Sequence, residues 1–386
     1  MTIDTEAATA HYIDGLGAEA LAKAAAYTHG GHWLLLWGLV VSALVTWVIV
    51  RTGLLDRVEQ RLSRRGPNLR AFVIAIVFFG VSVLLSLPWT LYESWWREKS
   101  YGRTSQPLAD FLGQGAIALL LSAVLGALFM TGVYALIRRS GRTWWIWSAG
   151  LTAIAMSALL LAAPIVIEPL FNEFKPVPAG PVRDAVAEIA ERAGVPTDRI
   201  FVYDGSRQSN NFTANAAGLG GSARIAISDV AFKGASLDEV KAVTGHEVGH
   251  YVLGHVWRFV VMTAGFAVVF FFLVDRLFPV FMRAFGGQAR LSDPVGLPVV
   301  LFMVSLFGFL AGPLVNALSR ADEIEADRYS LETVNLPDAL ASALVKTAEY
   351  RNPRPTPLEE ALFYDHPSVE RRVRTAMEWK ASHETH

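Results

Sequence analysis

The residues of this sequence best suited to chemistry are His246, Glu247 and His250, which form the pattern H-E-x-x-H. On a helix, residues four apart lie on one face, so the two imidazoles would project side by side. Two histidines in that arrangement can share one Zn²⁺ and leave positions for a third ligand and a water. A glutamate beside the first histidine can act as general base on that water. The motif therefore predicts a zinc centre with Glu247 as the catalytic base.

The sequence around the motif favours a helix. Ser236 and Glu239 form a capping-box pattern, with serine at the N-cap and glutamate three residues later. An apolar-rich run follows as far as Leu253. We therefore expect the motif to lie on a helix that begins directly after Ser236.

A second acidic stretch lies at residues 319–327 and could supply a third ligand from another helix. Three carboxylates compete for that role, those of Glu323, Glu325 and Asp327. Glu323 and Asp327 are four residues apart and share a helix face, so one could bind the metal while the other orients a ligand histidine. Glu325 points elsewhere on such a helix. The alternative is an acidic helix start that carries ordinary surface charge.

The composition indicates an integral membrane protein. Of the 386 residues 53% are hydrophobic and only 18% are charged, which is too apolar for a soluble domain. The net charge of −1 gives no case for binding nucleic acid. The chain has no cysteine, which excludes disulfides, thiolate ligands and cysteine nucleophiles. Any transition-metal site must therefore use histidine and carboxylate.

Six apolar stretches are long enough to cross a bilayer as helices, and four of them precede the H-E-x-x-H motif. They cover about 33–50, 71–91, 113–137, 144–167, 259–277 and 295–317. The second contains Pro88, which can kink it, and the fourth begins with tryptophans that suit the membrane interface. The sixth runs directly into the acidic stretch. Residues 1–30 lack the pattern of a secretory signal peptide.

The chain divides into membrane and polar parts. We expect a polar, amphipathic segment at 1–32, four membrane helices at 33–172, a catalytic domain at 173–256, two membrane helices at 257–318, and the third-ligand helix with the rest of the catalytic domain at 319–386. Within 173–256 the pattern predicts a helix at 182–193, short strands at 200–203 and 224–227, and a hairpin turn at Gly218, Gly220 and Gly221. The fold class is thus a polytopic α-helical membrane protein with an α+β metalloprotease domain. Substrate should reach the site from the membrane or within it.

Several further motifs resemble the type I CAAX prenyl proteases, which are integral-membrane zinc metalloproteases that cut prenylated proteins. The similarity covers about residues 15–375. The matching stretches are Leu87-Pro88-Trp89-Thr90-Leu91-Tyr92 with Glu98 and Tyr101-Gly102, Glu168-Pro169-Leu170-Phe171-Asn172-Glu173-Phe174, Ser319-Arg320 with Glu323 and Ala326-Asp327, and His366-Pro367-Ser368 with Arg372.

The resemblance implies roles for particular residues. It makes Glu323 the third ligand of one Zn²⁺ per chain and places Asp327 behind the ligands. It puts His366 and Arg372 near the substrate and the developing oxyanion, where such groups would stabilise a tetrahedral intermediate. The segment from Asp204 to Gly218 resembles an edge strand that pairs with the substrate backbone. Its candidate substrate-binding residues are Thr213, Ala214 and Asn215, where the family usually shows Asn-Ala-Tyr.

The family also implies a large intramembrane chamber walled by seven membrane helices. The six stretches here are one fewer, and the missing helix is the first. Outside the motifs, His255 is five residues past His250 and about 140° round a continued helix, so we interpret it as an interfacial residue. His29 and His32 suit headgroup contacts, and His383 and His386 belong to the C-terminal tail.

The expected partners are a peptide or protein substrate, prenylated or membrane-associated, and the lipid bilayer. One alternative enzyme is a bacterial quality-control protease that ignores prenyl groups, and a non-enzymatic alternative is an inactive scaffold or transporter. The alanine-, arginine- and glycine-rich composition favours a bacterial inner membrane. Arginines of the 51–70 and 138–142 loops place the catalytic domain outside the cytoplasm by the positive-inside rule, whereas the family resemblance implies a cytoplasmic domain. We expect the family's orientation.

Overall fold

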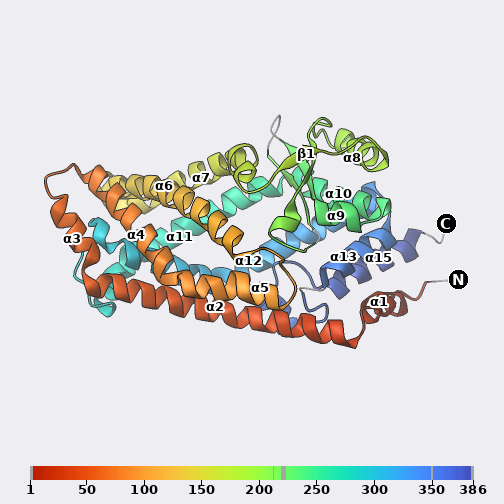
Figure 1. The fold of residues 1–386 in the computed structure, drawn as a ribbon, viewed down its shortest axis with the longest axis horizontal. Coiled ribbons are helices and arrows are strands. Elements are labelled where there is room, and N and C mark those ends of the chain that lie inside the picture. The colour runs from red at the N-terminus through yellow and green to blue at the C-terminus, as the bar shows by residue number, and fades with distance from the viewer. Residues whose placement is uncertain (1–2, 212, 219–222, 349–350, 384–386) are drawn as a thin grey trace.

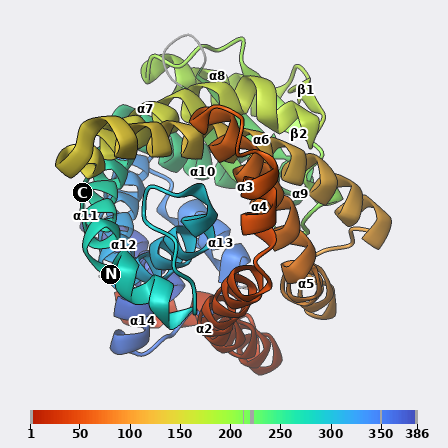
Figure 2. The same ribbon diagram turned by 90° about the vertical axis from the view of Figure 1, so that its left-hand side faces the viewer.

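The computed structural model describes residues 3–211, 213–218, 223–348 and 351–383. Its membrane part consists of long helices that run side by side (Figure 1). They are α2 (Ala18–Thr52), α4 (Pro67–Thr90), α6 (Leu108–Ser140), α7 (Trp144–Ala162), α11 (His255–Ala284) and α12 (Leu297–Thr333). Each contacts the next in this order, and α12 returns to α2, so the helices form a closed ring. Figure 2 views this ring along its long axis.

Five continuous helical segments of the described residues are long and apolar enough to cross a membrane. The longest, Leu108–Leu170, contains both α6 and α7, which are separated by a 3₁₀ turn at Gly141–Thr143. Gly141 has a φ of 52°, a left-handed conformation that favours glycine and reverses the chain here. Each of the six predicted membrane stretches therefore lies in its own helix, as the sequence indicated.

The ring is packed at one end only. Its buried apolar cluster comes from the end of α2, the start of α4, the end of α6, the start of α7, the second half of α11 and the start of α12. All of these lie at the end of the molecule that carries the arginine-rich connections, opposite the catalytic domain (Figure 1). The half of the ring nearer the catalytic domain has few buried side chains.

A proline alters one wall of the ring. Pro88 lies in the last turn of α4, where it cannot donate a backbone hydrogen bond. The helix continues as a π-helical segment, η1 (Leu91–Trp96), and then as α5 (Arg97–Ser100). The sequence predicted a kink at Pro88; the structure shows a local change of helix type after it, followed by a turn with Gly102 at a φ of 74°.

The predicted catalytic domain is built on a four-stranded sheet with the strand order β1-β2-β4-β3. Its strands are β1 (Phe174–Pro176), β2 (Ile200–Tyr203), β3 (Ala214–Ala217) and β4 (Arg224–Ser228). β2 and β4 are parallel, with Ile200 opposite Ile225, and the two outer pairings are antiparallel. Helices α8 (Pro181–Arg192), α9 (Asp229–Gly234) and α10 (Leu237–Val252) share a buried apolar cluster with the sheet. The two strands and the helix predicted from hydrophobic patterns are present, whereas β1 was not predicted.

A second cluster joins the two ends of the chain. It brings together α1 (Thr5–Asp14), α13 (Pro337–Thr347) and α15 (Val369–His383), with Ile13 and Leu331 among its buried residues. The N-terminal segment thus packs against the C-terminal part of the catalytic domain. The remaining elements are α3 (Leu54–Arg61), η3 (Ala163–Ile167), η4 (Glu168–Leu170), η5 (Gly205–Arg207), η7 (Pro294–Gly296) and α14 (Pro357–Phe363).

Candidate metal centre

Helix α10 starts where the sequence predicted. The Ser236 hydroxyl accepts a hydrogen bond from the Glu239 backbone N–H at 3.2 Å, and the Glu239 carboxylate accepts one from the Ser236 N–H at 2.7 Å. This capping box satisfies two backbone donors that would otherwise lack partners at the helix start. From this start, His246 and His250 fall on one face of the helix, turned toward α12.

Two glycines let α10 approach α12 closely. A Cβ at Gly245 would lie 2.6 Å from Val334 Cγ2, and one at Gly249 would lie 3.3 Å from the Cα of Ala326. Both distances are shorter than an ordinary carbon–carbon contact of about 3.5–4.0 Å. Between the helices, the Ser330 hydroxyl also donates to the Ala242 carbonyl at 2.7 Å. This crossing brings the histidines within reach of the acidic part of α12.

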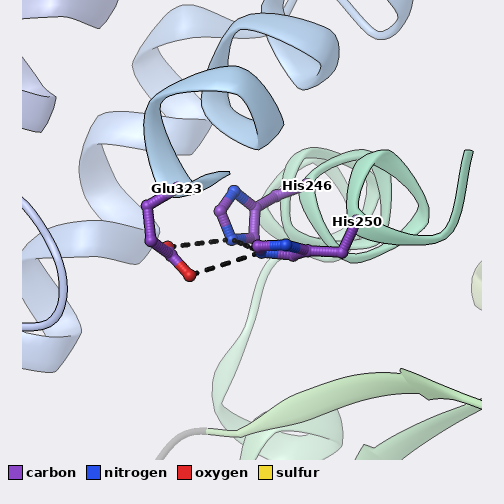
Figure 3. Close-up of side chains that lie close together, drawn as sticks. All are labelled: His246, His250 and Glu323. Carbon is purple, nitrogen blue, oxygen red and sulfur yellow. Dashed lines mark hydrogen bonds and ion pairs between the residues drawn. The ribbon is translucent and has the colours of Figure 1, made fainter. Parts of the chain in front are cut away.

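His246, His250 and Glu323 converge on one point (Figure 3). The two Nε2 atoms are 3.2 Å apart. His246 Nε2 lies 3.4 Å from one Glu323 oxygen, and His250 Nε2 lies 3.3 Å from the other. In a tetrahedral zinc site with bonds of about 2.0–2.1 Å, ligand atoms are separated by about 3.3 Å. The three side chains are thus spaced as a zinc ion requires.

The chemistry of the donor set also fits a metal. The Glu323 side chain is buried, yet its Oε2 atom has no hydrogen-bond partner. A buried carboxylate oxygen without a hydrogen bond is costly; Arg372, whose Nη2 atom lies 3.5 Å away, compensates for part of this cost, and a metal ion would add to that compensation. Two imidazoles and one carboxylate form the ligand set of catalytic zinc sites that keep a position open for water.

Asp327 lies directly behind His246, as expected for the second carboxylate on this face. Its Oδ1 atom is 2.9 Å from His246 Nδ1, so His246 can present its Nε2 atom to the metal. Burial alone would lower the pKa of His246, but the Asp327 and Glu323 carboxylates outweigh it and raise that pKa to about 10. Metal binding at neutral pH must therefore displace a proton from His246.

Arg372 holds Asp327 in place. Its Nε and Nη2 atoms donate to the two oxygens of Asp327, both at 2.7 Å, and all of these groups are buried. The same Nη2 atom lies 3.5 Å from Glu323 Oε2. The structure thus places Arg372 against the carboxylates behind the ligands. The role that the family resemblance implies for it, near the developing oxyanion, remains a prediction.

Glu247 faces a cavity of about 200 Å³ beside the predicted ligands. Burial raises the pKa of its carboxyl group, and the nearby Glu323 adds to this, while the two imidazoles and a backbone hydrogen bond with Ala216 act in the opposite direction. A raised pKa suits a carboxylate that must both take and give a proton. The cavity lining also includes Thr213, Ala214, His246, Glu323, His366 and Arg372.

His366 reaches this cavity from the turn between α14 and α15. Its Nε2 atom lies 3.2 Å from Glu323 Oε1, and its Nδ1 atom lies 2.8 Å from Asp365 Oδ1. About a quarter of its side chain remains exposed, so a bound substrate could reach it. The predicted position of His366 near the site therefore agrees with the structure, while its role is untested.

The expected substrate-binding segment is β3, an edge strand of the sheet. β3 pairs with β4 on one side only and contacts α10. Thr213 and Ala214 line the cavity, whereas the Asn215 side-chain oxygen is buried without a hydrogen bond. The Thr213 hydroxyl is 2.9 Å from the Tyr203 hydroxyl. Of the predicted hairpin glycines, Gly218 has a φ of 90°, and Gly220 and Gly221 lie outside the described residues.

The membrane part anchors the loop that precedes β3. Two hydrogen bonds join this loop to the turn after α5. The Asn210 N–H donates to the Arg103 carbonyl at 2.8 Å, and the Thr104 hydroxyl donates to the Gln208 carbonyl at 2.7 Å. Arg207, in the same loop, forms a salt bridge with Asp110 of α6 at 2.6 Å. The motif around Tyr101-Gly102 therefore has a structural part in positioning the edge strand.

Two features of the site were missed from the sequence. The glycines of the helix crossing, Gly245 and Gly249, show a four-residue spacing that could have indicated close helix packing. His255 was interpreted as interfacial because a continuous helix was assumed. Instead, α10 ends at Val252, and Gly254 takes a φ of 72°, so His255 folds back onto His250. Glu325, as expected, points away from the predicted ligands and forms a salt bridge with Arg258.

The fold and this donor set define a membrane metallopeptidase, and comparisons with known proteins agree. A model of peptidase family M48 matches residues 176–380, and a model described as the N-terminal part of CAAX prenyl proteases, with five membrane helices, matches residues 5–173. The chain belongs to peptidase family M48. Within residues 5–173 the described structure has four such helices, α2, α4, α6 and α7.

Individual relatives are distant but cover most of the chain. An uncharacterized metalloprotease of Bacillus subtilis, YhfN, is 26% identical over 92% of this chain and 85% of its own length. CAAX prenyl protease 1 of Saccharomyces cerevisiae is 26% identical over 89% of this chain and 78% of its own. The crystal structure of S. mikatae Ste24p superposes with a TM-score of 0.77 at 20% identity, covering 97% of this chain and 94% of that one. These matches confirm the predicted family, fold class and metallopeptidase activity.

Proposed function

We propose that this protein is a zinc-dependent endopeptidase that cleaves membrane-associated substrates. The observation that carries the proposal is the mutual spacing of 3.2–3.4 Å among donor atoms of His246, His250 and Glu323. These three residues would hold one Zn²⁺ per chain. A zinc ion held there would lower the pKa of a water and polarise the scissile carbonyl.

The remaining steps fall to residues of the chain. Glu247 takes the proton from the attacking water and later delivers it to the leaving amine. Its raised pKa makes its carboxylate a better acceptor of the proton from the attacking water. His366, at the cavity wall, would hydrogen-bond the oxyanion that forms on the carbonyl oxygen. Asp327, fixed by Arg372, would keep His246 oriented throughout.

We propose that the substrate backbone adds to the sheet along the free edge of β3. An extended peptide can pair with such an edge through main-chain hydrogen bonds and present its side chains to neighbouring pockets. Thr213, Ala214 and Asn215 would then lie beside the bound peptide. Ala216 of this strand is hydrogen-bonded to Glu247, so a peptide on this edge would pass close to the base.

The substrate's route would begin in the bilayer. A cavity of about 760 Å³ lies between α2 and α12, with Gly38 and Ser42 on one helix and Gly308 and Gly312 on the other. Its lining extends to Asp365, which directly precedes His366. Small residues on both helices leave room for an apolar chain.

A prenylated C-terminus is the substrate that this route would suit best. Relatives from yeast and plants carry the name CAAX prenyl protease 1 or its homologue. A prenyl group could occupy the apolar cavity while the peptide joined to it reaches β3. We further propose a bacterial inner-membrane location with the catalytic domain in the cytoplasm, following the family resemblance against the arginine distribution.

Matched peptides would test this proposal. The purified protein is incubated with two peptides of identical sequence, one farnesylated at a C-terminal CAAX cysteine and one unmodified. Selective cleavage of the farnesylated peptide supports the prenyl specificity. Equal cleavage of both would leave the endopeptidase and refute the prenyl requirement, as expected for a quality-control protease. Absence of cleavage in the zinc-loaded protein would contradict the proposed substrate class.

A further inference from the structure

The imidazole of His250 has a partner on the side that faces away from the predicted metal. Its Nε2 atom faces Glu323 and His246. Its Nδ1 atom lies 2.8 Å from Nδ1 of His255, and the two rings meet edge to face at 5.0 Å. The exposed fraction of His255 is only 5%, so water does not easily replace this contact.

The contact depends on the turn between α10 and α11. Gly254, with a φ of 72°, lies between the two helices as the N-cap of α11. The first residue of α11 therefore packs against the last turn of α10. No neighbouring atom lies within 4 Å of a Cβ built on Gly254, so its backbone conformation rather than crowding favours glycine.

The chain of contacts continues from His255 to a carboxylate. His255 Nε2 lies 3.2 Å from Glu325 Oε2. Arg258 donates to Glu325 at 2.8 Å and to Asp322 at 2.7 Å, and thereby fixes both carboxylates. His255, Asp322 and Glu325 are close enough to hold a cation, but the guanidinium of Arg258 already supplies positive charge there. The cluster is therefore better suited to hold His255 than to bind a second metal.

One assignment of protons satisfies every contact. If His250 binds metal through Nε2, its Nδ1 must carry the hydrogen and donate to His255 Nδ1. His255 Nδ1 then has to be the acceptor, so its Nε2 carries a hydrogen that is donated to Glu325. No other pair of neutral tautomers keeps Nε2 of His250 free for a metal and makes both hydrogen bonds.

We propose that His255 is a positioning residue that fixes the tautomer and ring orientation of His250. It also links His250 to the carboxylate of Glu325 through a relay of two hydrogen bonds. His246 receives the same support directly from Asp327, at 2.9 Å. Each predicted ligand histidine thus has a carboxylate behind it, one in contact and one through a second imidazole. This inference rests on the proposed function, because it concerns a ligand of the same metal centre.

Two isosteric substitutions separate the two halves of the relay. In His255→Asn the side-chain oxygen can take the place of Nδ1 and still accept from His250, but it cannot reach Glu325. In His255→Gln the amide group extends to the place of Nε2 and keeps the contact with Glu325 while His250 loses its acceptor. His255→Ala removes both contacts, and His29→Gln, at an exposed histidine away from the site, serves as control.

Zinc affinity is measured on the full-length protein by competition with a chelator, and the absorption spectrum is recorded with Co²⁺ in place of zinc. Loss of a group that orients a ligand histidine typically weakens metal binding 10–100-fold. We expect such a loss, with a changed Co²⁺ spectrum, for the Gln and Ala variants, and a smaller loss for the Asn variant, which keeps the acceptor for His250 but lacks the contact with Glu325. Equal weakening in Asn and Gln, or wild-type affinity in all three, would overturn the inference. Wild-type protein that binds no zinc would instead refute the proposed function.

Discussion

The close crossing of α10 and α12 predicts a graded response to added methyl groups at its glycines. In Gly245→Ala, the new Cβ would lie 2.6 Å from Val334 Cγ2 and 3.0 Å from Ser330 Oγ. Normal contact requires about 1 Å more. The valine is β-branched and cannot easily swing away, so the helices must move apart.

Two free-energy terms determine how much Gly245→Ala changes the stability of the fold. Overpacking of this kind destabilises the fold by about 1–3 kcal/mol, whereas alanine in place of glycine within a helix stabilises it by about 1 kcal/mol. The expected net loss of folding free energy is therefore about 0–2 kcal/mol. The effect on metal binding should be larger, because ligand distances tolerate changes of only about 0.2 Å. We expect zinc affinity to fall at least about tenfold, which corresponds to roughly 1.4 kcal/mol.

Two further variants calibrate this response. Gly249→Ala brings a Cβ to 3.2 Å from the Tyr329 side chain and 3.3 Å from the Ala326 backbone, so an intermediate loss is expected. Gly265→Ala, on an exposed face of α11, meets nothing within 4 Å and should bind zinc normally. The assays are denaturant unfolding in detergent and chelator competition for zinc. Wild-type zinc affinity in Gly245→Ala would refute the idea that this crossing sets the ligand spacing.

Other predictions concern the support of the site, pH and orientation. Asp327→Ala should weaken zinc binding about 10–100-fold in the same competition assay, and unchanged affinity would show that it orients no ligand. Burial alone would raise the pKa of Glu239, but a hydrogen bond from Lys346 helps to hold that pKa below its ordinary value. Its stabilising effect is therefore complete above pH about 4.3 and is lost as pH falls through the lowered pKa. Denaturation of zinc-free protein should thus show Glu239→Gln less stable than wild type at pH 7, with a difference that shrinks below pH 4; a difference independent of pH would contradict this. Because the chain has no cysteine, Ser63→Cys, just after α3, and Arg183→Cys, in α8, report on two elements at opposite ends of the molecule (Figure 1). An impermeant maleimide on intact cells should label only the first if the catalytic domain is cytoplasmic, and labelling of only the second would reverse the orientation.

Local patterns were sufficient to predict the two histidine ligands and the helix face that carries the third. The four-residue spacing of His246 and His250, the capping box before them and the shared face of Glu323 and Asp327 all follow from the helical period. The helical spacing alone did not show which of the three carboxylates of α12 is the third ligand, and the family motif was needed for that assignment. The apolar stretches likewise predicted the membrane helices, because a bilayer requires about 20 apolar residues in a spanning helix.

What the sequence did not reveal depends on contacts between distant segments. Hydropathy placed the start of the first membrane helix near residue 33, but α2 begins at Ala18, because a helix continues beyond the apolar region wherever its backbone stays hydrogen-bonded. The position of His255 depends on a single left-handed glycine, which a helical projection cannot represent. The strand β1 has only three residues and owes its existence to pairing with β2.

The most direct test of the account combines zinc content and cleavage for wild-type protein and Glu247→Gln. We predict one zinc per chain in both proteins by elemental analysis, because Glu247 is not among the three predicted ligands. We predict peptide cleavage by the wild type and a rate lower by about 10²–10⁴-fold in the variant, the usual contribution of a general base. Wild-type cleavage rates in Glu247→Gln, or undiminished cleavage by protein from which zinc has been removed, would contradict the account.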